Sequence, residues 1–273
     1  MRPNFLCIGT FRAGTSWLFR VLKRHPEVFL PDEKELMFFS RHYGKGIEWY
    51  EKLFDGHRGQ KYAGDISPCY LSSKEAPKRI QRHLSDVRIL AILRNPVDQI
   101  WSLYRLWITR SYTRKDLMLA LREEAELLDN VRYFEHLSNY LEYFDEKQLL
   151  ILFYEDLKAD PLLFLKSLYN FLDIEEFYVD DFVRVWNKSR QPRSMIIEKI
   201  IVTTGDLLRR SGMISLKTWL NKTGISDIVK SLNTTCEDEE SIPEDIRSFV
   251  NAYIMDDKEN LARLVGKDLS YWK

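Results

Sequence analysis

Residues 5–18 read FLCIGTFRAGTSWL and predict a short apolar strand, a turn and the start of a helix. Gly9 and Gly14 lie in the turn, and Thr15 and Ser16 begin the helix. A strand, turn and helix in this order direct backbone N–H groups and the positive end of the helix dipole toward one point. We expect a phosphate group to bind there.

The spacing of this loop is close to that of a Walker A loop, G-x-x-x-x-G-K-[ST]. Gly9 and Gly14 have the required separation and Ser16 is in place, but Thr15 occupies the position of the lysine. The loop carries a cation earlier, at Arg12. The pattern therefore indicates a nucleotide phosphate site that is not arranged for conventional transfer of a γ-phosphoryl group.

Strand and helix patterns alternate along the first 172 residues. Segments such as RILAIL and LLILF are almost wholly apolar, which is typical of strands buried on both faces of a parallel sheet. We expect strands at 4–8, 61–64, 88–93 and 149–153, and helices at 16–24, 46–54, 76–84, 97–109, 131–144 and 161–172. The alternation predicts an α/β fold in which helices flank a central parallel sheet and ligands bind at the carboxyl ends of the strands.

After about Asp173 the pattern changes to helices and loops with no clear strand. We interpret this part as a helical C-terminal portion of the same domain, so that residues 1–273 form one domain. Residues 236–245, CEDEESIPED, predict an acidic surface loop that leads into a helix, with Pro243 suited to its first turn.

Composition limits the classes of function. Of the 273 residues, 45% are hydrophobic, and the 41 basic residues balance the 41 acidic ones. A packed globular protein is expected, without general affinity for nucleic acid or anionic membranes. No apolar run is long enough to span a bilayer, and the N-terminus lacks a signal-peptide pattern. Three widely spaced cysteines form no zinc or disulfide pattern, which predicts a cytoplasmic protein without a bound metal.

A second candidate site lies in residues 92–107, ILRNPVDQIWSLYRLW. Arg94 follows a buried strand, Asn95-Pro96 forms a turn, and Ser102 lies on the next helix, eight residues after Arg94. An arginine and a hydroxyl in this arrangement can clamp a second phosphate. Arg94 could instead cap the loop, with Ser102 packed against the sheet. Two anion sites at adjacent strand ends favour a nucleotide with two separate phosphates.

A third candidate site lies in residues 31–50, PDEKELMFFSRHYGKGIEWY. Glu35 precedes the apolar patch 36–39 and can serve as a general base. Taken alone, this signal does not separate Glu35 from the other acidic residues of the segment, Asp32, Glu33 and Glu48.

Together these segments resemble the sulfotransferases that use 3′-phosphoadenosine-5′-phosphosulfate (PAPS). FRAGTSWL (11–18) is similar to the 5′-phosphosulfate loop of that family, K-x-G-T-T-x-L, and RNPVDQIWS (94–102) to its 3′-phosphate motif. KELMFF (34–39), HYGKGIEWY (42–50) and GDISPCYL (64–71) resemble the branch that contains the heparan sulfate sulfotransferases. Segments 152–161, 187–194 and 261–272 resemble bacterial members.

The resemblance implies a P-loop-like fold, PAPS as the sulfonate donor, PAP as the product and no metal. It implies that Glu35 removes the proton of the acceptor and that Arg94 and Ser102 bind the 3′-phosphate. Arg190 and Arg193 lie in a segment that closes over the nucleotide in relatives, although a solvated basic turn would have the same sequence. The 5′-phosphosulfate is expected to contact the first loop, at Arg12, Ala13, Gly14, Thr15, Ser16 and Trp17.

Three departures from the family pattern affect this interpretation. Arg12 replaces a lysine, and because a guanidinium does not give up a proton, charge stabilisation is expected from it instead of proton transfer. Gln99 occupies a position that often carries a second arginine. Asp65-Ile66 replaces a usual Glu-Lys pair, which removes a cation that Lys34, Arg41 or Lys45 could replace.

The predicted activity is in-line transfer of a sulfonate group from PAPS to an acceptor hydroxyl or amine of a carbohydrate or a small metabolite. Two alternatives stay open: a P-loop kinase of small molecules, which would need the Walker lysine and acidic magnesium ligands, and a module that binds the nucleotide without chemistry. Basic and aromatic residues at 40–46 and 105–116 suit several acceptors. The sequence does not predict the oligomeric state.

Overall fold

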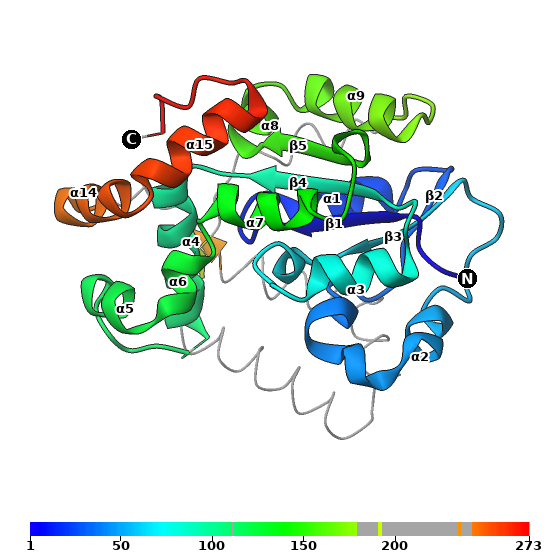
Figure 1. The fold of residues 1–273 in the computed structure, drawn as a ribbon, viewed down its shortest axis with the longest axis horizontal. Helices are drawn as coiled ribbons and strands as arrows, with labels where there is room; N and C mark the ends of the chain where they lie inside the picture. The colour runs from blue at the N-terminus through cyan, green and yellow to red at the C-terminus, as the bar shows by residue number, and fades with distance from the viewer. Residues whose placement is uncertain (111, 179–190, 193–233, 236–241, 273) are drawn as a thin grey trace.

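The computed structural model describes residues 1–110, 112–178, 191–192, 234–235 and 242–272. A five-stranded parallel sheet with the strand order β2-β3-β1-β4-β5 forms the centre of the fold (Figure 1). Its strands are β1 (Phe5–Gly9), β2 (Val28–Phe29), β3 (Tyr62–Ile66), β4 (Arg88–Leu93) and β5 (Leu149–Phe153). The α/β architecture predicted from the alternating pattern is confirmed.

The inner strands β3, β1 and β4 are buried on both faces, and the alternation of side chains along each strand divides the core in two. In β1, Leu6 and Ile8 belong to one cluster, whereas Phe5 and Cys7 belong to the other. All four are fully buried. Successive side chains point to opposite faces of a strand, so a strand covered on both sides reads as a continuous apolar run.

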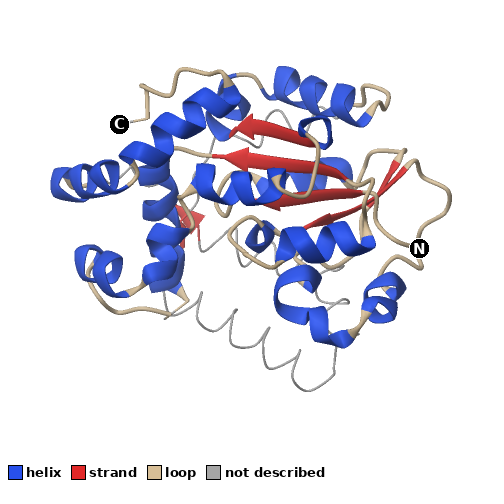
Figure 2. Ribbon diagram, in the orientation of Figure 1, coloured by secondary structure: helices blue, strands red, loops and turns tan. Residues whose placement is uncertain are grey.

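Helices cover both faces of the sheet (Figure 2). The cluster around Phe5 and Cys7 includes side chains of α1 (Thr15–Leu22), α8 (Tyr154–Ala159) and α9 (Pro161–Leu172). The opposite cluster is larger. It includes side chains of α2 (Ile47–Lys52), α3 (Ala76–His83), α4 (Pro96–Thr109), α5 (Leu117–Glu123), α6 (Ala125–Asp129), α7 (Tyr133–Leu141), α14 (Glu244–Tyr253) and α15 (Met255–Val265).

The C-terminal helices pack on this same core. Ile246 and Val250 of α14, Leu261 of α15 and Trp272 beyond it are all buried in the larger cluster. Asp257 of α15 accepts hydrogen bonds from the first backbone amides of α7 and so caps that helix from a distant part of the chain. The described C-terminal helices therefore belong to a single α/β domain. Among the described residues, no helix is both long enough and apolar enough to cross a membrane.

The predicted and observed elements differ where tertiary contacts define the element. Strands 88–93 and 149–153 and helix 161–172 have the predicted bounds, and the other predicted elements differ by one to three residues at their ends. The two-residue strand β2 and the helices α5, α6 and α8 were not predicted. The expectation of no strand after Asp173 is wrong: β6 (Gln191–Pro192) and β7 (Thr234–Thr235) pair antiparallel. Two-residue strands are too short to show a periodic pattern.

The order of the strands positions the candidate site. The chain runs from central β1 to edge strand β2, returns through β3, and then crosses to β4 on the other side of β1. Ligands of open α/β sheets bind at the carboxyl ends of the strands where the winding changes direction. Here that position is above β1, between the ends of β3 and β4.

Candidate functional site

The loop between β1 and α1 has the geometry of a phosphate-binding turn. Gly14 is the N-cap of α1 and is left-handed, with φ 84° and ψ 5°. Arg12 in the same loop also has a positive φ, 63°. The first amides of a helix have no acceptor within the helix, so those of Thr15 and Ser16 are available to an anion, whereas Trp17 N already donates to Gly14 O at 3.0 Å. Ala13 is fully buried, backbone included, so no part of this residue is exposed at the surface of the loop.

A lysine joins this loop to the predicted base. The Nζ of Lys34 donates to Thr15 Oγ1 at 3.3 Å, to Ser16 Oγ at 3.2 Å and to Glu35 Oε1 at 2.7 Å. The hydroxyls at the start of α1 and the Glu35 carboxylate therefore contact the same ammonium group. Lys34 is one of the three cations, with Arg41 and Lys45, that could replace the lysine of the usual Glu-Lys pair. Its hydrogen bonds place its ammonium group beside the loop hydroxyls.

The backbone that carries Glu35 has an uncommon conformation. Glu35 and Met37 both have positive φ values, 63° and 51°. Hydrogen bonds to the end of β3 hold this segment: Glu35 N donates to Ile66 O at 3.2 Å, and Met37 N donates to Ser67 Oγ at 3.0 Å. Non-glycine residues in the left-handed region cost free energy and tend to gather at functional sites. Arg12 lies in the loop itself and Glu35 is linked to it through Lys34, whereas the fourth such residue, Asp173, follows α9.

A buried carboxylate lies beneath this segment. Asp65, 1% exposed, accepts hydrogen bonds from Tyr50 Oη at 2.9 Å, Ser67 Oγ at 2.7 Å and Tyr70 Oη at 2.6 Å. Burial raises the pKa of Asp65, and the hydroxyl hydrogen bonds only partly oppose this effect. The sequence comparison predicted only that Asp65-Ile66 removes a cation. It did not predict that the Asp65 carboxylate accepts hydrogen bonds from three buried hydroxyls. A charged residue within an apolar strand pattern was the available signal.

The second predicted anion site lies beside the first loop. Arg12 Nε donates to Ser102 Oγ at 2.8 Å, and Arg94 Nη1 donates to the backbone oxygen of Arg12 at 2.8 Å. The Arg94 Nε is buried and has no hydrogen-bond partner within the described part of the chain. The three residues that sequence motifs assigned to two phosphates are thus in direct contact.

Aromatic and acidic side chains that sequence reasoning missed support Arg94. Its guanidinium carbon lies 4.7 Å from the centre of the Tyr154 ring, and its backbone oxygen accepts from Tyr133 Oη at 2.9 Å. Glu155 accepts from the backbone amide of Asn95 at 2.8 Å. Burial raises the pKa of Glu155, although that hydrogen bond opposes the effect. These residues follow β5 or begin α7, so only the tertiary fold brings them to Arg94.

Three other predicted cofactor contacts have different outcomes. Trp17 is 3% exposed and packs edge to face against Phe164, at a ring separation of 6.1 Å. Its side chain belongs to the core because the helical period turns it toward α9, so the surface of the loop is formed without it. Arg190 and Arg193 lie outside the described residues.

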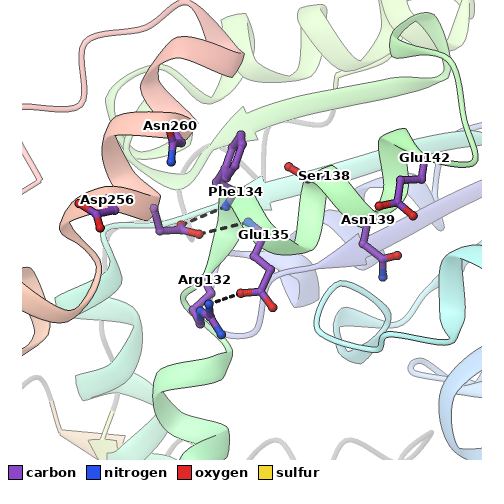
Figure 3. A pocket seen from close by; sticks show the side chains of 9 residues that line it. Arg132, Phe134, Glu135, Ser138, Asn139, Glu142, Asp256 and Asn260 are labelled. Carbon is purple, nitrogen blue, oxygen red and sulfur yellow. Dashed lines mark hydrogen bonds and ion pairs between the residues drawn. The ribbon is translucent and has the colours of Figure 1, made fainter.

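A separate pocket of about 480 Å³ lies between α7 and α15 (Figure 3). None of its lining residues belongs to the predicted site, and it suits an anionic nucleotide poorly because acidic side chains dominate it. The acidic lining residues are Glu135, Glu142, Asp256 and Asp257. Within the described residues, no group of three or more His, Cys, Asp or Glu side chains is placed to hold a metal ion.

Comparison with known proteins assigns the family. The model of the sulfotransferase domain matches residues 2–193, which is more than half of the chain. The chain belongs to the sulfotransferase domain family. The resemblance predicted from the phosphate motifs is thereby confirmed, and the site described above lies within the matched part of this sulfotransferase domain.

Relatives and solved structures agree with that assignment. The sulfotransferase domain is 31% identical over 139 residues to the membrane-associated sulfotransferase kil1 of Dictyostelium discoideum, covering 46% of this chain and 29% of the relative. It is 29% identical over 186 residues to heparan sulfate glucosamine 3-O-sulfotransferase 6 of Mus musculus, covering 65% of this chain and 54% of the relative. The matches thus span about a third to a half of these relatives' lengths.

Its fold is similar to that of a solved bacterial structure. A crystal structure of a sulfotransferase from Alicyclobacillus acidocaldarius superimposes with a TM-score of 0.74 at 22% identity. The superposition covers 100% of this chain and 99% of that one. The similarity extends to the whole α/β architecture.

Proposed function

We propose that this sulfotransferase domain transfers a sulfonate group from PAPS to a hydroxyl, or less favourably an amine, of a carbohydrate or small-molecule acceptor. The observation that carries the proposal is the contact of Lys34 with both the loop hydroxyls and Glu35. It supports an arrangement in which a group held by the loop lies near a carboxylate able to take a proton.

The described residues suit a donor that carries two anionic groups. The loop supplies amides at a helix start and the hydroxyls of Thr15 and Ser16 on one side. Arg94, with its buried unpartnered Nε, and Ser102 lie on the other side. A neutral or singly charged ligand would leave one of the two sides without a counter-charge.

PAPS supplies an activated sulfonate: the sulfur–oxygen bond to its 5′-phosphate breaks as a sulfur–oxygen bond to the acceptor forms. Glu35 takes the proton that the acceptor oxygen loses. The loop amides and hydroxyls stabilise the negative charge that the broken bond leaves on the 5′-phosphate. Arg12 keeps its positive charge and contacts the nucleotide phosphates without acting as an acid.

The names of the relatives favour a carbohydrate acceptor. One relative is described as a glucosamine 3-O-sulfotransferase, and another, from Mus musculus, as a bifunctional heparan sulfate N-deacetylase/N-sulfotransferase. Both names include heparan sulfate, and they specify O-sulfotransfer in the first case and N-sulfotransfer in the second. Fold alone does not determine substrate, so the acceptor needs a direct test.

The test is transfer from sulfur-labelled PAPS to three acceptors: a glucosamine oligosaccharide with acetylated nitrogens, the same oligosaccharide with free amines, and a phenol. We expect label on the acetylated oligosaccharide, whose only acceptors are hydroxyls. If only the free-amine form were labelled, the acceptor group would be an amine and not a hydroxyl. Binding of PAP without transfer to any of the three would favour a binding module, and consumption of ATP without sulfonate transfer would favour a kinase.

A further inference from the structure

Arg12 is tied at both ends to the residues predicted to bind the 3′-phosphate. Its side chain donates to Ser102 Oγ at 2.8 Å, and its backbone oxygen accepts from Arg94 at 2.8 Å. Its left-handed backbone, with φ 63°, accompanies this orientation toward α4. A cation at this loop position was expected beside the 5′-phosphosulfate, but here it lies at the other anion site.

The charges around Arg12 are all of one sign. The pKa of its guanidinium is lowered, first because neighbouring protein atoms partly desolvate this exposed residue and then because Arg94, Arg110 and Arg105 are also positive. Tyr154 is the neighbour that opposes these effects. Among the ion pairs between described residues, none involves Arg12 or Arg94. A cluster of arginines is typical of an anion-binding site, and here Glu155, whose pKa is raised by burial, is a carboxylate close enough for Arg94 to oppose that rise.

Gln99 adds no charge to this cluster. It is fully buried, and its Nε2 donates to Thr10 Oγ1 at 3.2 Å at the base of the loop. This neutral side chain is therefore directed toward the end of β1. Arg12 supplies the second guanidinium from the other side of the site.

Lys34 holds the corresponding position at the 5′ side. Its ammonium lies at the N-terminus of α1, in contact with Thr15, Ser16 and Glu35. Its side chain is 18% exposed, less than the 34% of Glu35. A helix N-terminus disfavours a cation, and the Glu35 carboxylate offsets this cost in the free protein. An anion seated on the loop would offset it further.

We propose that Arg12 and Lys34 divide the two anionic groups of the donor between them. Arg12 binds the 3′-phosphate together with Arg94 and Ser102, and Lys34 binds the 5′-phosphosulfate together with Thr15 and Ser16. This assignment rests on the proposed function. In this arrangement Lys34 stabilises the 5′-phosphate oxygen that keeps the electron pair of the broken sulfur–oxygen bond, while Glu35 holds the proton of the acceptor.

Calorimetric titration with two nucleotides separates the two roles. AMP carries the 5′-phosphate alone, whereas PAP carries both phosphates. The dissociation constant of AMP divided by that of PAP therefore measures the contribution of the 3′-phosphate to binding. Arg12→Met should lower this ratio by about tenfold or more, because a charged hydrogen bond to phosphate is lost. Lys34→Met should weaken both nucleotides by about tenfold and leave the ratio within about twofold.

Lys61→Met is the matched control. Lys61 pairs with Asp173 at 2.9 Å, as Lys34 pairs with Glu35, but it precedes β3 and so lies at the opposite end of the sheet. Replacing Lys61 should change the dissociation constant of neither AMP nor PAP. The division is overturned if Arg12→Met leaves the ratio intact or if Lys34→Met lowers it. A wild-type protein that binds PAP no more tightly than AMP would instead overturn the proposed function itself.

Discussion

Removing the Asp65 carboxylate, which lies close to the segment that carries Glu35, should lower the free energy of unfolding of the domain. Asp65 is 1% exposed, and the three side chains that donate to it, Tyr50, Ser67 and Tyr70, are all fully buried. In Asp65→Ala each of these hydroxyls loses its acceptor, at a cost of about 1–3 kcal/mol per group. Relief from burying a carboxylate offsets several kcal/mol of that sum, so a net loss of about 3 kcal/mol is expected.

Thermal unfolding followed by circular dichroism measures this loss. In domains of this size each kcal/mol lowers Tm by about 2–4 °C, so Asp65→Ala should unfold about 6–12 °C below the wild type. Asp65→Asn keeps the shape and one acceptor oxygen and should lose about a third as much. If Asp65→Ala unfolded within about 2 °C of the wild type, the carboxylate would not be holding the Tyr50–Ser67–Tyr70 cluster, and the reasoning would be refuted.

Three further predictions concern the loop, the second anion site and pH. Gly9→Ala should cost about 1–3 kcal/mol in chemical denaturation, because the new Cβ would lie 2.6 Å from Leu71 Cβ; Gly44→Ala, with nothing within 4 Å, should be neutral. Arg94→Met should weaken PAP about tenfold or more by calorimetry, and equal weakening by the control Arg88→Met, at the amino end of the same strand, would argue against a local role. Because folding raises the pKa of Asp65, its proton stabilises the fold fully below the unfolded pKa of about 4, and this contribution is lost as pH rises through the folded pKa. The stability of the wild type relative to Asp65→Asn should therefore fall as pH is raised from about 4, and a rise would contradict the assignment.

The parts of the fold that follow a local pattern could be predicted from the sequence. β4 is an apolar run that is buried at every position after Arg88, and α9 begins at Asp160-Pro161 with an acidic N-cap that accepts from two backbone amides. β5 is equally apolar but lies at the edge of the sheet, where only Phe153 is fully buried. β2 could not be predicted, since it consists of two residues defined by their pairing with β3.

The candidate site was predictable where motifs have fixed spacing. The positions of Gly14, Arg94 and Ser102 relative to their strands and helices follow directly from the loop and turn patterns. The residue that each cation contacts could not be predicted from these patterns. Arg12 meets Ser102 across 90 residues of sequence, and only the packing of α4 beside the β1–α1 loop brings them together. No local pattern encodes such a contact.

The most direct test of the central claim compares Glu35→Gln with the wild type, using labelled PAPS and the acceptor that the screen identifies. Glu35 contacts Lys34, whose ammonium also contacts the loop hydroxyls. Its replacement should lower turnover by about two orders of magnitude or more, because the acceptor proton has no base to receive it. The affinity for PAP should change by less than about tenfold, since the phosphates are bound by other groups. Turnover equal to that of the wild type would contradict the account.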